Sequence, residues 1–220
     1  MNNEKMQSFF TKVYLWMFIG LLVSAGVSYY TSINKELLSL LASSYIFVVL
    51  IEFGVVIALT ALIKKVSPTV AKILFIIYSA LNGFTLASIF MVYKLDSIVM
   101  IFLGAALLFI LLAIYGYVTK TDLTKFGKVL FIGLIAIIIM SIINMFVGGS
   151  SFGSVIAIIS IMIFLGLTAY DMQKLERIYY SYENDANMLD KIAIYGALDL
   201  YLDFINIFIE LLRLFGNRRD

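Results

Sequence analysis

Long apolar segments separated by short polar ones run along almost the whole of this 220-residue chain. A helix needs about 20 predominantly apolar residues to cross the hydrocarbon of a bilayer. Seven segments meet that length and predict transmembrane helices at about residues 10–31, 43–63, 70–93, 97–118, 128–147, 153–172 and 192–215. The longest connection, residues 173–191, is too short for a second domain. We therefore expect one seven-helix membrane domain over residues 1–220.

Local signals add two details to this picture. Ser67 followed by Pro68 is typical of an N-cap with proline at the first helical position, so the third helix should begin there. With the N-terminus in the cytoplasm, eleven Lys and Arg residues fall on the inner side and five on the outer side, which favours this orientation and an outer C-terminus. The basic tail with Arg218 and Arg219 argues against it locally. A last helix that re-enters the membrane or stops short would place that tail inside.

The amino-acid composition excludes several kinds of site and partner. Hydrophobic residues make up 63% of the chain and charged residues 14%, and neither cysteine nor histidine occurs. Disulfides and zinc sites of the His/Cys kind are therefore excluded, and we expect no resident cofactor. A net charge of +2 gives no reason to expect nucleic acid as a partner. The expected surroundings are the lipid bilayer.

One face of the last predicted helix is polar. Its polar residues follow one another at steps of 4, 3, 4 and 3, which places them on the same side of a helix: Asp199, Asp203, Asn206, Glu210 and Arg213. Such a face cannot lie against lipid, so it must face other helices or water. Six spans could surround this helix and leave it central.

We expect different roles for the polar residues of the predicted spans. Glu210 and Arg213 are expected to form an interfacial ion pair, since charges at helix ends reach the membrane surface. Asn206 is expected to hydrogen-bond between helices, and so are two further asparagines, Asn82 and Asn144. Asp203 has no basic residue three or four positions away, so we interpret it as functional. Glu52, isolated in the second span, fits equally a structural partner for a basic group and a residue of an ion pathway.

Five segments, in order along the chain, carry a family resemblance: FFTKVYLWMFIGLLVSAG, YSALNGFTLASIF, YGYVTKTDLTKFGKVLFIGLIAIIIMSIIN, LGLTAYDMQKL and DLYLDFINIFIELLRLFG. They resemble the Bax inhibitor-1 (transmembrane Bax inhibitor motif) family, especially its bacterial members. The resemblance implies an all-α fold with six helices wrapped around a central C-terminal helix. It also implies an integral protein of a bacterial plasma membrane that acts as a pH-sensitive calcium leak channel and is not an enzyme.

The resemblance assigns the site residue by residue. The AYD motif of the sixth span places one aspartate of a pH-sensing pair at Asp171, and the YLDF motif places the other at Asp203. Both would also serve as calcium ligands. Some relatives carry an arginine in the second span that contacts the pair, whereas this chain has only Lys64 and Lys65 at the end of that span. The long connection between the two aspartates is a second departure.

Depth in the membrane leaves the partner of Asp171 open. With a rise of about 1.5 Å per residue, Asp171 lies near the inner edge of the hydrocarbon, Asp199 somewhat deeper, and Asp203 deeper by about 6 Å more. Depth alone would therefore pair Asp171 with Asp199, whereas the family motif selects Asp203. We adopt Asp203 and keep Asp199, Glu52, Asn206, Glu210 and Arg213 as accessory residues of the pathway.

The chemistry of such a pair suggests a gate. Two carboxylates about 4 Å apart repel by about 4 kcal/mol at an effective dielectric of 20, so they are expected to share one proton. That proton would tie the sixth and seventh helices together, and the ionised acids would offer oxygen ligands to Ca²⁺. Acid could close the path by forming the shared proton, or open it by protonating both acids.

Three other functions are compatible with membrane aspartates. Tyr170-Asp171 and Gly196-Ala-Leu-Asp199 resemble motifs of intramembrane aspartyl proteases, but Leu198 stands where a glycine is needed and the proline-based motif is missing. Buried acids also serve as proton relays in transporters. A non-conducting regulator of membrane partners is the third alternative. Calcium ions and protons are the expected partners, and the sequence indicates no particular protein partner.

Overall fold

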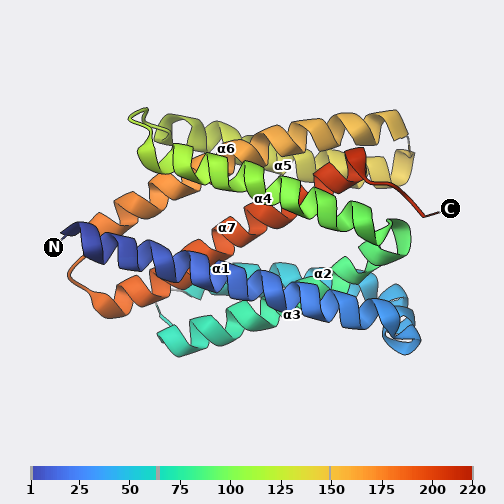
Figure 1. The fold of residues 1–220 in the computed structure, drawn as a ribbon, viewed down its shortest axis with the longest axis horizontal. Coiled ribbons are helices and arrows are strands. Elements are labelled where there is room, and N and C mark those ends of the chain that lie inside the picture. The colour runs from blue at the N-terminus through green and yellow to red at the C-terminus, as the bar shows by residue number, and fades with distance from the viewer. Residues whose placement is uncertain (1, 63–64, 149, 220) are drawn as a thin grey trace. The chain divides into compact units, whose positions relative to one another are not determined.

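All seven predicted spans are helices (Figure 1). In this computed structural model residues 2–62, 65–148 and 150–219 are described, and both the predicted end of the second span at residue 63 and Lys64 lie outside them. The helices of the described ranges are α1 Asn2–Ile33, α2 Lys35–Leu62, α3 Pro68–Val92, α4 Leu95–Val118, α5 Thr124–Val147, α6 Ser150–Tyr182 and α7 Ala186–Phe215. These ranges contain no β-strand. The predicted all-α, seven-helix fold class is therefore confirmed.

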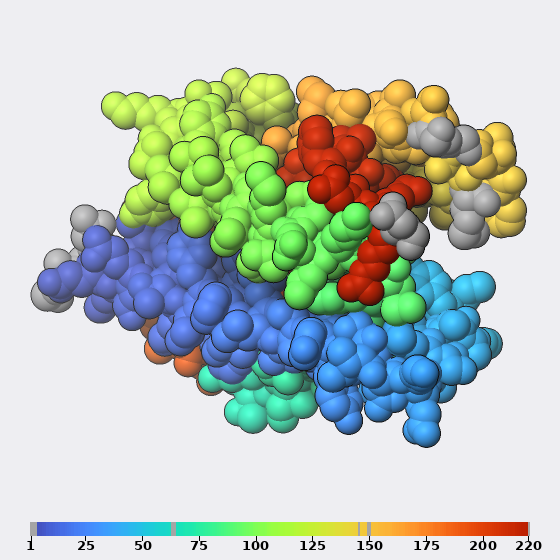
Figure 2. Space-filling view, turned by 45° about the vertical axis from the view of Figure 1, so that its right-hand side comes forward, coloured from blue at the N-terminus to red at the C-terminus, as the bar shows by residue number. Residues whose placement is uncertain are grey.

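Every helix has the length and composition of a membrane span. The shortest helices have 24 residues, which corresponds to about 36 Å, more than the hydrocarbon thickness of about 30 Å. Only 11% of the apolar stretch of α2 and 6% of that of α5 is buried, and Ile46 and Phe146 are among the most exposed side chains. Figure 2 shows one face of this surface, with α1 in blue and α4 in green. Large apolar side chains on the outside are what a lipid-facing surface requires.

Helix α7 is the most enclosed of the seven. In its apolar stretch 72% of the residues are buried, against 39% or less in each of the other helices. The burial agrees with the prediction that the polar last helix is shielded from lipid by the others.

The helices group into two compact units. One unit consists of Met1–Tyr93, Ile178–Tyr201 and Arg219, and the other mainly of Lys94–Arg177 and Leu202–Arg218. The chain passes from one unit to the other between α3 and α4, near the end of α6 and within α7, so the first half of α7 belongs to the first unit and the second half to the second. The expectation of a single domain stays a prediction.

Helix α6 is longer than predicted. The expected long polar connection over residues 173–191 is wrong, because α6 continues to Tyr182 and α7 already begins at Ala186. Leu175 and Tyr179 are completely or almost completely buried, and they extend the packed face of α6 beyond its apolar stretch. Asp185 then caps α7 by accepting a hydrogen bond from Met188 N at 2.9 Å.

Polar contacts lie at both ends of α3. Ser67 is the predicted N-cap of α3, and its hydroxyl accepts a hydrogen bond from Val70 N. At the other end of α3, Lys94 N donates to Asn217 O at 2.9 Å. The backbone of the C-terminal tail is therefore bonded to the start of α4.

Close helix contacts depend on two glycines. A Cβ atom on Gly83 of α3 would lie 2.6 Å from the carbonyl oxygen of Ser24 in α1. In the second unit, a Cβ atom on Gly116 of α4 would lie 2.3 Å from the carbonyl oxygen of Ala169 in α6. Small residues let membrane helices approach this closely, and dispersion contacts then hold them together.

We expect Gly116→Ala to destabilise the protein by about 1–3 kcal/mol, because the added methyl group meets backbone atoms that cannot move aside. The matched control is Gly104→Ala in the same helix, where the Cβ atom meets nothing within 4 Å. The control should be neutral or slightly stabilising, since alanine is the better helix former. Thermal unfolding in detergent measures both variants, and equal midpoints would contradict the close α4–α6 contact.

Candidate functional site

Asp171 is a buried carboxylate with a basic neighbour on its own helix. It lies in α6 with 8% of its surface exposed, and Lys174 Nζ donates to its Oδ1 at 3.1 Å. The sequence analysis missed Lys174 as a site residue. The spacing of three residues on one helix face was the available signal.

The turn between α4 and α5 is fixed to the same part of α6. Gln173 Oε1 accepts a hydrogen bond from Leu123 N, and Gln173 Nε2 donates to Thr121 O, both at 2.9 Å. One turn later, Arg177 forms an ion pair with Asp122 at 3.6 Å. A movement of α6 around Asp171 would therefore carry this turn with it or break these contacts.

Asp122 is an exposed acid of the α4–α5 turn. Hydrogen bonds from the Thr124 hydroxyl and amide, helped by Arg177 and Lys125, lower the pKa of Asp122. Because the pKa is lower in the folded state, these contacts stabilise the turn at neutral pH. Their contribution is lost only as the pH falls through that lowered pKa.

Asp203 is the most buried acid of the polar face of α7, with 4% of its surface exposed. Packing from α4 fixes the helix around it. The ring of Phe204 lies 5.1 Å from that of Phe102 and 5.8 Å from that of Phe109, and Phe102 also contacts Phe208. Asp171 and Asp203 belong to the same compact unit. Their pairing remains a prediction.

The other residues of this polar face of α7 are half-buried, except Arg213, which is exposed. Asp199 is half-buried and belongs to the first unit. Glu210 and Arg213 form the predicted ion pair, with 3.2 Å between Oε2 and NH1. The described contacts of Asn206 do not include the predicted interhelical bond, because its amide group donates to Leu202 O one turn back in α7. Side chains of this kind often bond to their own helix.

A buried hydroxyl network in the first unit was not predicted. The hydroxyl of Tyr201 in α7 donates to Asn82 Oδ1 in α3 at 2.8 Å and lies 2.6 Å from Ser24 Oγ in α1. Ser24 Oγ also lies 2.7 Å from Ser79 O. Tyr201 is fully buried, and the rings of Phe75 and Tyr78 pack edge-on against it. Asn82 thus makes the interhelical bond expected of it.

Glu52 adjoins this network, whereas Asn144 lies in the second unit. Glu52 Oε1 accepts a hydrogen bond from the Thr85 hydroxyl at 2.9 Å, and the side chain of Asn82 also hydrogen-bonds to Glu52, so its described partners are polar groups of α3 rather than a basic side chain. Asn144 Oδ1 is buried, and no hydrogen bond reaches it from the described residues. Across those residues no group of three or more carboxylates lies close enough together to hold a metal ion. The assignment of Asp171 and Asp203 as calcium ligands stays a prediction.

The chain is similar to a known family over nearly its whole length. Residues 6–220 match the family described as "Inhibitor of apoptosis-promoting Bax1". An uncharacterised protein of Borreliella burgdorferi strain B31 is 44% identical over 96% of this chain and 93% of its own length. The inner membrane protein YbhL of Escherichia coli strain K12 is 42% identical over 97% of this chain and 93% of its own length. An uncharacterised membrane protein of Streptococcus pyogenes serotype M1 is 38% identical over 96% of this chain and 93% of its own length.

Tyr201→Phe should lower the free energy of unfolding by about 1 kcal/mol, because Asn82 Oδ1 loses the buried hydroxyl that donates to it. The matched control is Tyr30→Phe, since the side chain of Tyr30 is 60% exposed and the loss of its hydroxyl should change little. Thermal unfolding in detergent compares the two. If both variants melt together, the hydroxyl network does not stabilise the first unit.

Proposed function

Since this chain belongs to the Bax inhibitor-1 family, we propose that this integral membrane protein lets calcium ions leak across a bacterial inner membrane under the control of pH. The observation that supports the proposal is the burial of two acids, Asp171 and Asp203, in apolar helices of one compact unit. Intramembrane carboxylates are costly, and they are usually retained for transport or proton transfer. The inner membrane is proposed because the Escherichia coli relative is an inner membrane protein by name.

In the proposed mechanism the two acids share one proton. Asp171 is carried by α6 and Asp203 by α7, so the proton ties two helices together. When the proton leaves, the like charges repel and the helices separate, which opens a polar path. A second proton would also break the tie. A proton shared between the two carboxylates thus converts a change in pH into a movement of helices.

The small number of oxygen ligands favours a leak over a storage site. Calcium prefers six to eight oxygen ligands, and two carboxylates with nearby carbonyl groups or waters bind it weakly. Conduction requires binding that is strong enough for entry and weak enough for release.

Lys174 supplies a positive charge to the proposed pair. Its ammonium group lies 3.1 Å from Asp171 Oδ1, and its side chain is partly buried. This charge stabilises the ionised form of Asp171 and opposes the repulsion from Asp203. In this chain Lys174 would thereby take part of the role that the resemblance gives to a second-span arginine.

Calcium flux into proteoliposomes, recorded between pH 5 and pH 8, tests the function as a whole. A pH-dependent flux supports the leak. A flux that requires a proton gradient would instead indicate a proton-coupled transporter, and the absence of flux at every pH would favour a non-conducting regulator. Cleavage of a membrane-embedded peptide by the same preparation would favour the protease.

Asp203→Asn should remove most of the pH dependence of calcium flux, since an amide cannot share the proton. Asp171→Asn should have nearly the same effect, and the double variant should add little, because residues that act as one unit are not additive. Flux from vesicles with equal protein content measures all three. If the two single effects simply add, the shared-proton mechanism is wrong.

Asp199→Asn is the matched control, because Asp199 lies on α7 one turn before Asp203. A shared proton requires oxygen atoms about 2.5–2.7 Å apart, whereas one helical turn is about 5.4 Å, so Asp171 cannot share its proton with both acids. The control variant should keep the pH response. Loss of the response in this variant alone would identify Asp199 as the partner.

Lys174→Gln should move the pH midpoint of the flux upward by about 0.5 pH unit, because the pair loses a charge that favours its ionised form. The expected direction is the same whether acid opens or closes the path. Lys128→Gln is the control, since Lys128 is exposed on α5. An unchanged midpoint in the Lys174 variant would show that this lysine does not act on the pair.

A further inference from the structure

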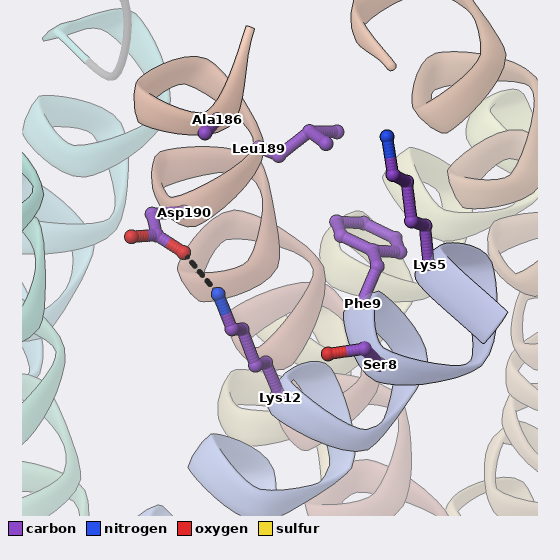
Figure 3. A pocket seen from close by; sticks show the side chains of 7 residues that line it. All are labelled: Lys5, Ser8, Phe9, Lys12, Ala186, Leu189 and Asp190. Carbon is purple, nitrogen blue, oxygen red and sulfur yellow. Dashed lines mark hydrogen bonds and ion pairs between the residues drawn. The ribbon is translucent and has the colours of Figure 1, made fainter. Parts of the chain in front are cut away.

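A small cavity lies between the beginning of α1 and the beginning of α7, within the first unit (Figure 3). Its volume is about 90 Å³. The residues that matter for its chemistry are Lys5, Ser8, Phe9 and Lys12 from α1 and Leu189 and Asp190 from α7. The proposed calcium path uses none of them.

The cavity carries an excess of positive charge. Lys12 Nζ contacts Asp190 Oδ1 at 2.6 Å, and both side chains are about half exposed, 54% and 40%. Asp190 is the one acid of this lining, so Lys5 adds a charge that no lining acid balances. Figure 3 shows Lys5 standing apart from the Lys12–Asp190 pair. Exposed ion pairs are weak, so an incoming anion can compete with Asp190 for Lys12.

An apolar wall adjoins these charges. Phe9 is 4% exposed, and its ring lies 5.3 Å from the ring of Tyr179 and 5.4 Å from that of Phe10. Phe9 and Phe10 also open the apolar stretch of α1. The cavity therefore lies at the boundary where the hydrocarbon of the membrane meets the headgroup layer. Lysines at this depth with an apolar wall beneath them suit a ligand that is charged at one end and apolar at the other.

The size of the cavity limits the ligand. At about 15 Å³ for each water, 90 Å³ holds about six waters. Drug-sized and nucleotide-sized ligands need about 300 Å³ or more. A single phosphate group is the kind of anion that fits.

We propose that this cavity binds the phosphodiester headgroup of an anionic phospholipid, with Lys5, Lys12 and the Ser8 hydroxyl as its donors. Basic pockets between membrane helices recognise lipid headgroups through the same combination of charge and position. The acyl chains would lie along the apolar side of α1. The proposal does not depend on calcium conduction.

Native mass spectrometry of the full-length protein in a neutral detergent tests the proposal. The protein is titrated with dioleoylphosphatidylglycerol or with dioleoylphosphatidylcholine, which carries no net charge. We expect the wild type to prefer phosphatidylglycerol, and Lys5→Gln to weaken its binding about fivefold without changing that of phosphatidylcholine. Lys35→Gln removes the same charge from the exposed start of α2 and should leave the preference unchanged.

Two results would overturn the proposal. If Lys5→Gln and Ser8→Ala both keep the wild-type preference, the cavity is not the binding site. If inorganic phosphate displaces phosphatidylglycerol at similar concentrations, the cavity recognises a free anion rather than a lipid. The lipid headgroup is supported if inorganic phosphate does not displace phosphatidylglycerol and if Lys5→Gln loses the preference for phosphatidylglycerol.

Discussion

The rest of the structure depends on one constraint: a helix that carries four acids must be kept away from lipid. Asp190, Asp199, Asp203 and Glu210 all lie in α7. A lipid tail offers no hydrogen bond and no solvation to a carboxylate, so such a helix is stable in a bilayer only when protein or water surrounds its polar face. The high burial of α7 meets this requirement. The mainly apolar helices α2 and α5 have no such requirement, and few residues of their apolar stretches are buried.

The two halves of α7 are enclosed by different kinds of contact. In the first unit the contacts are polar, since Tyr201 reaches Asn82 in α3 and Ser24 in α1. In the second unit they are aromatic, since Phe102 and Phe109 of α4 pack against Phe204. Buried hydrogen bonds and edge-on ring pairs both prefer particular geometries, so each kind of contact holds its half of the helix in place. Asp203 lies in the half that ring contacts from α4 enclose.

The membrane-spanning part of the fold could be predicted because hydrocarbon imposes a length and a composition on each helix. The Ser67 cap and the Glu210–Arg213 pair could also be predicted, since both depend on residues three apart. The end of α6 could not, because beyond the hydrocarbon its length depends on burial of Leu175 and Tyr179 by other segments. Local spacing is a good guide only to contacts within one helix.

The site was predictable to the same limited extent. Asp171 and Asp203 stand out as acids in apolar segments, and their burial could be expected. The Tyr201 network escaped prediction because tyrosine, serine and asparagine are each ordinary in membrane helices, and only their meeting in space is informative. The choice between Asp199 and Asp203 depends on the relative height of two helices to within one turn, and the apolar pattern does not define helix ends so closely.

The position of Lys174 changes what the gate has to overcome. A cation supplied by another helix would attract the acids across a helix interface and so resist separation of the helices. Lys174 lies on α6, three residues after Asp171, and moves together with it. It can therefore adjust the ionisation of Asp171 without adding to the tie between α6 and α7. A lysine also contributes a compact charge on a flexible stem, whereas the planar guanidinium of an arginine would bind a carboxylate through two bonds. In the proposed mechanism Lys174 thus sets the pH at which the shared proton leaves, and the proton itself supplies the tie between the helices.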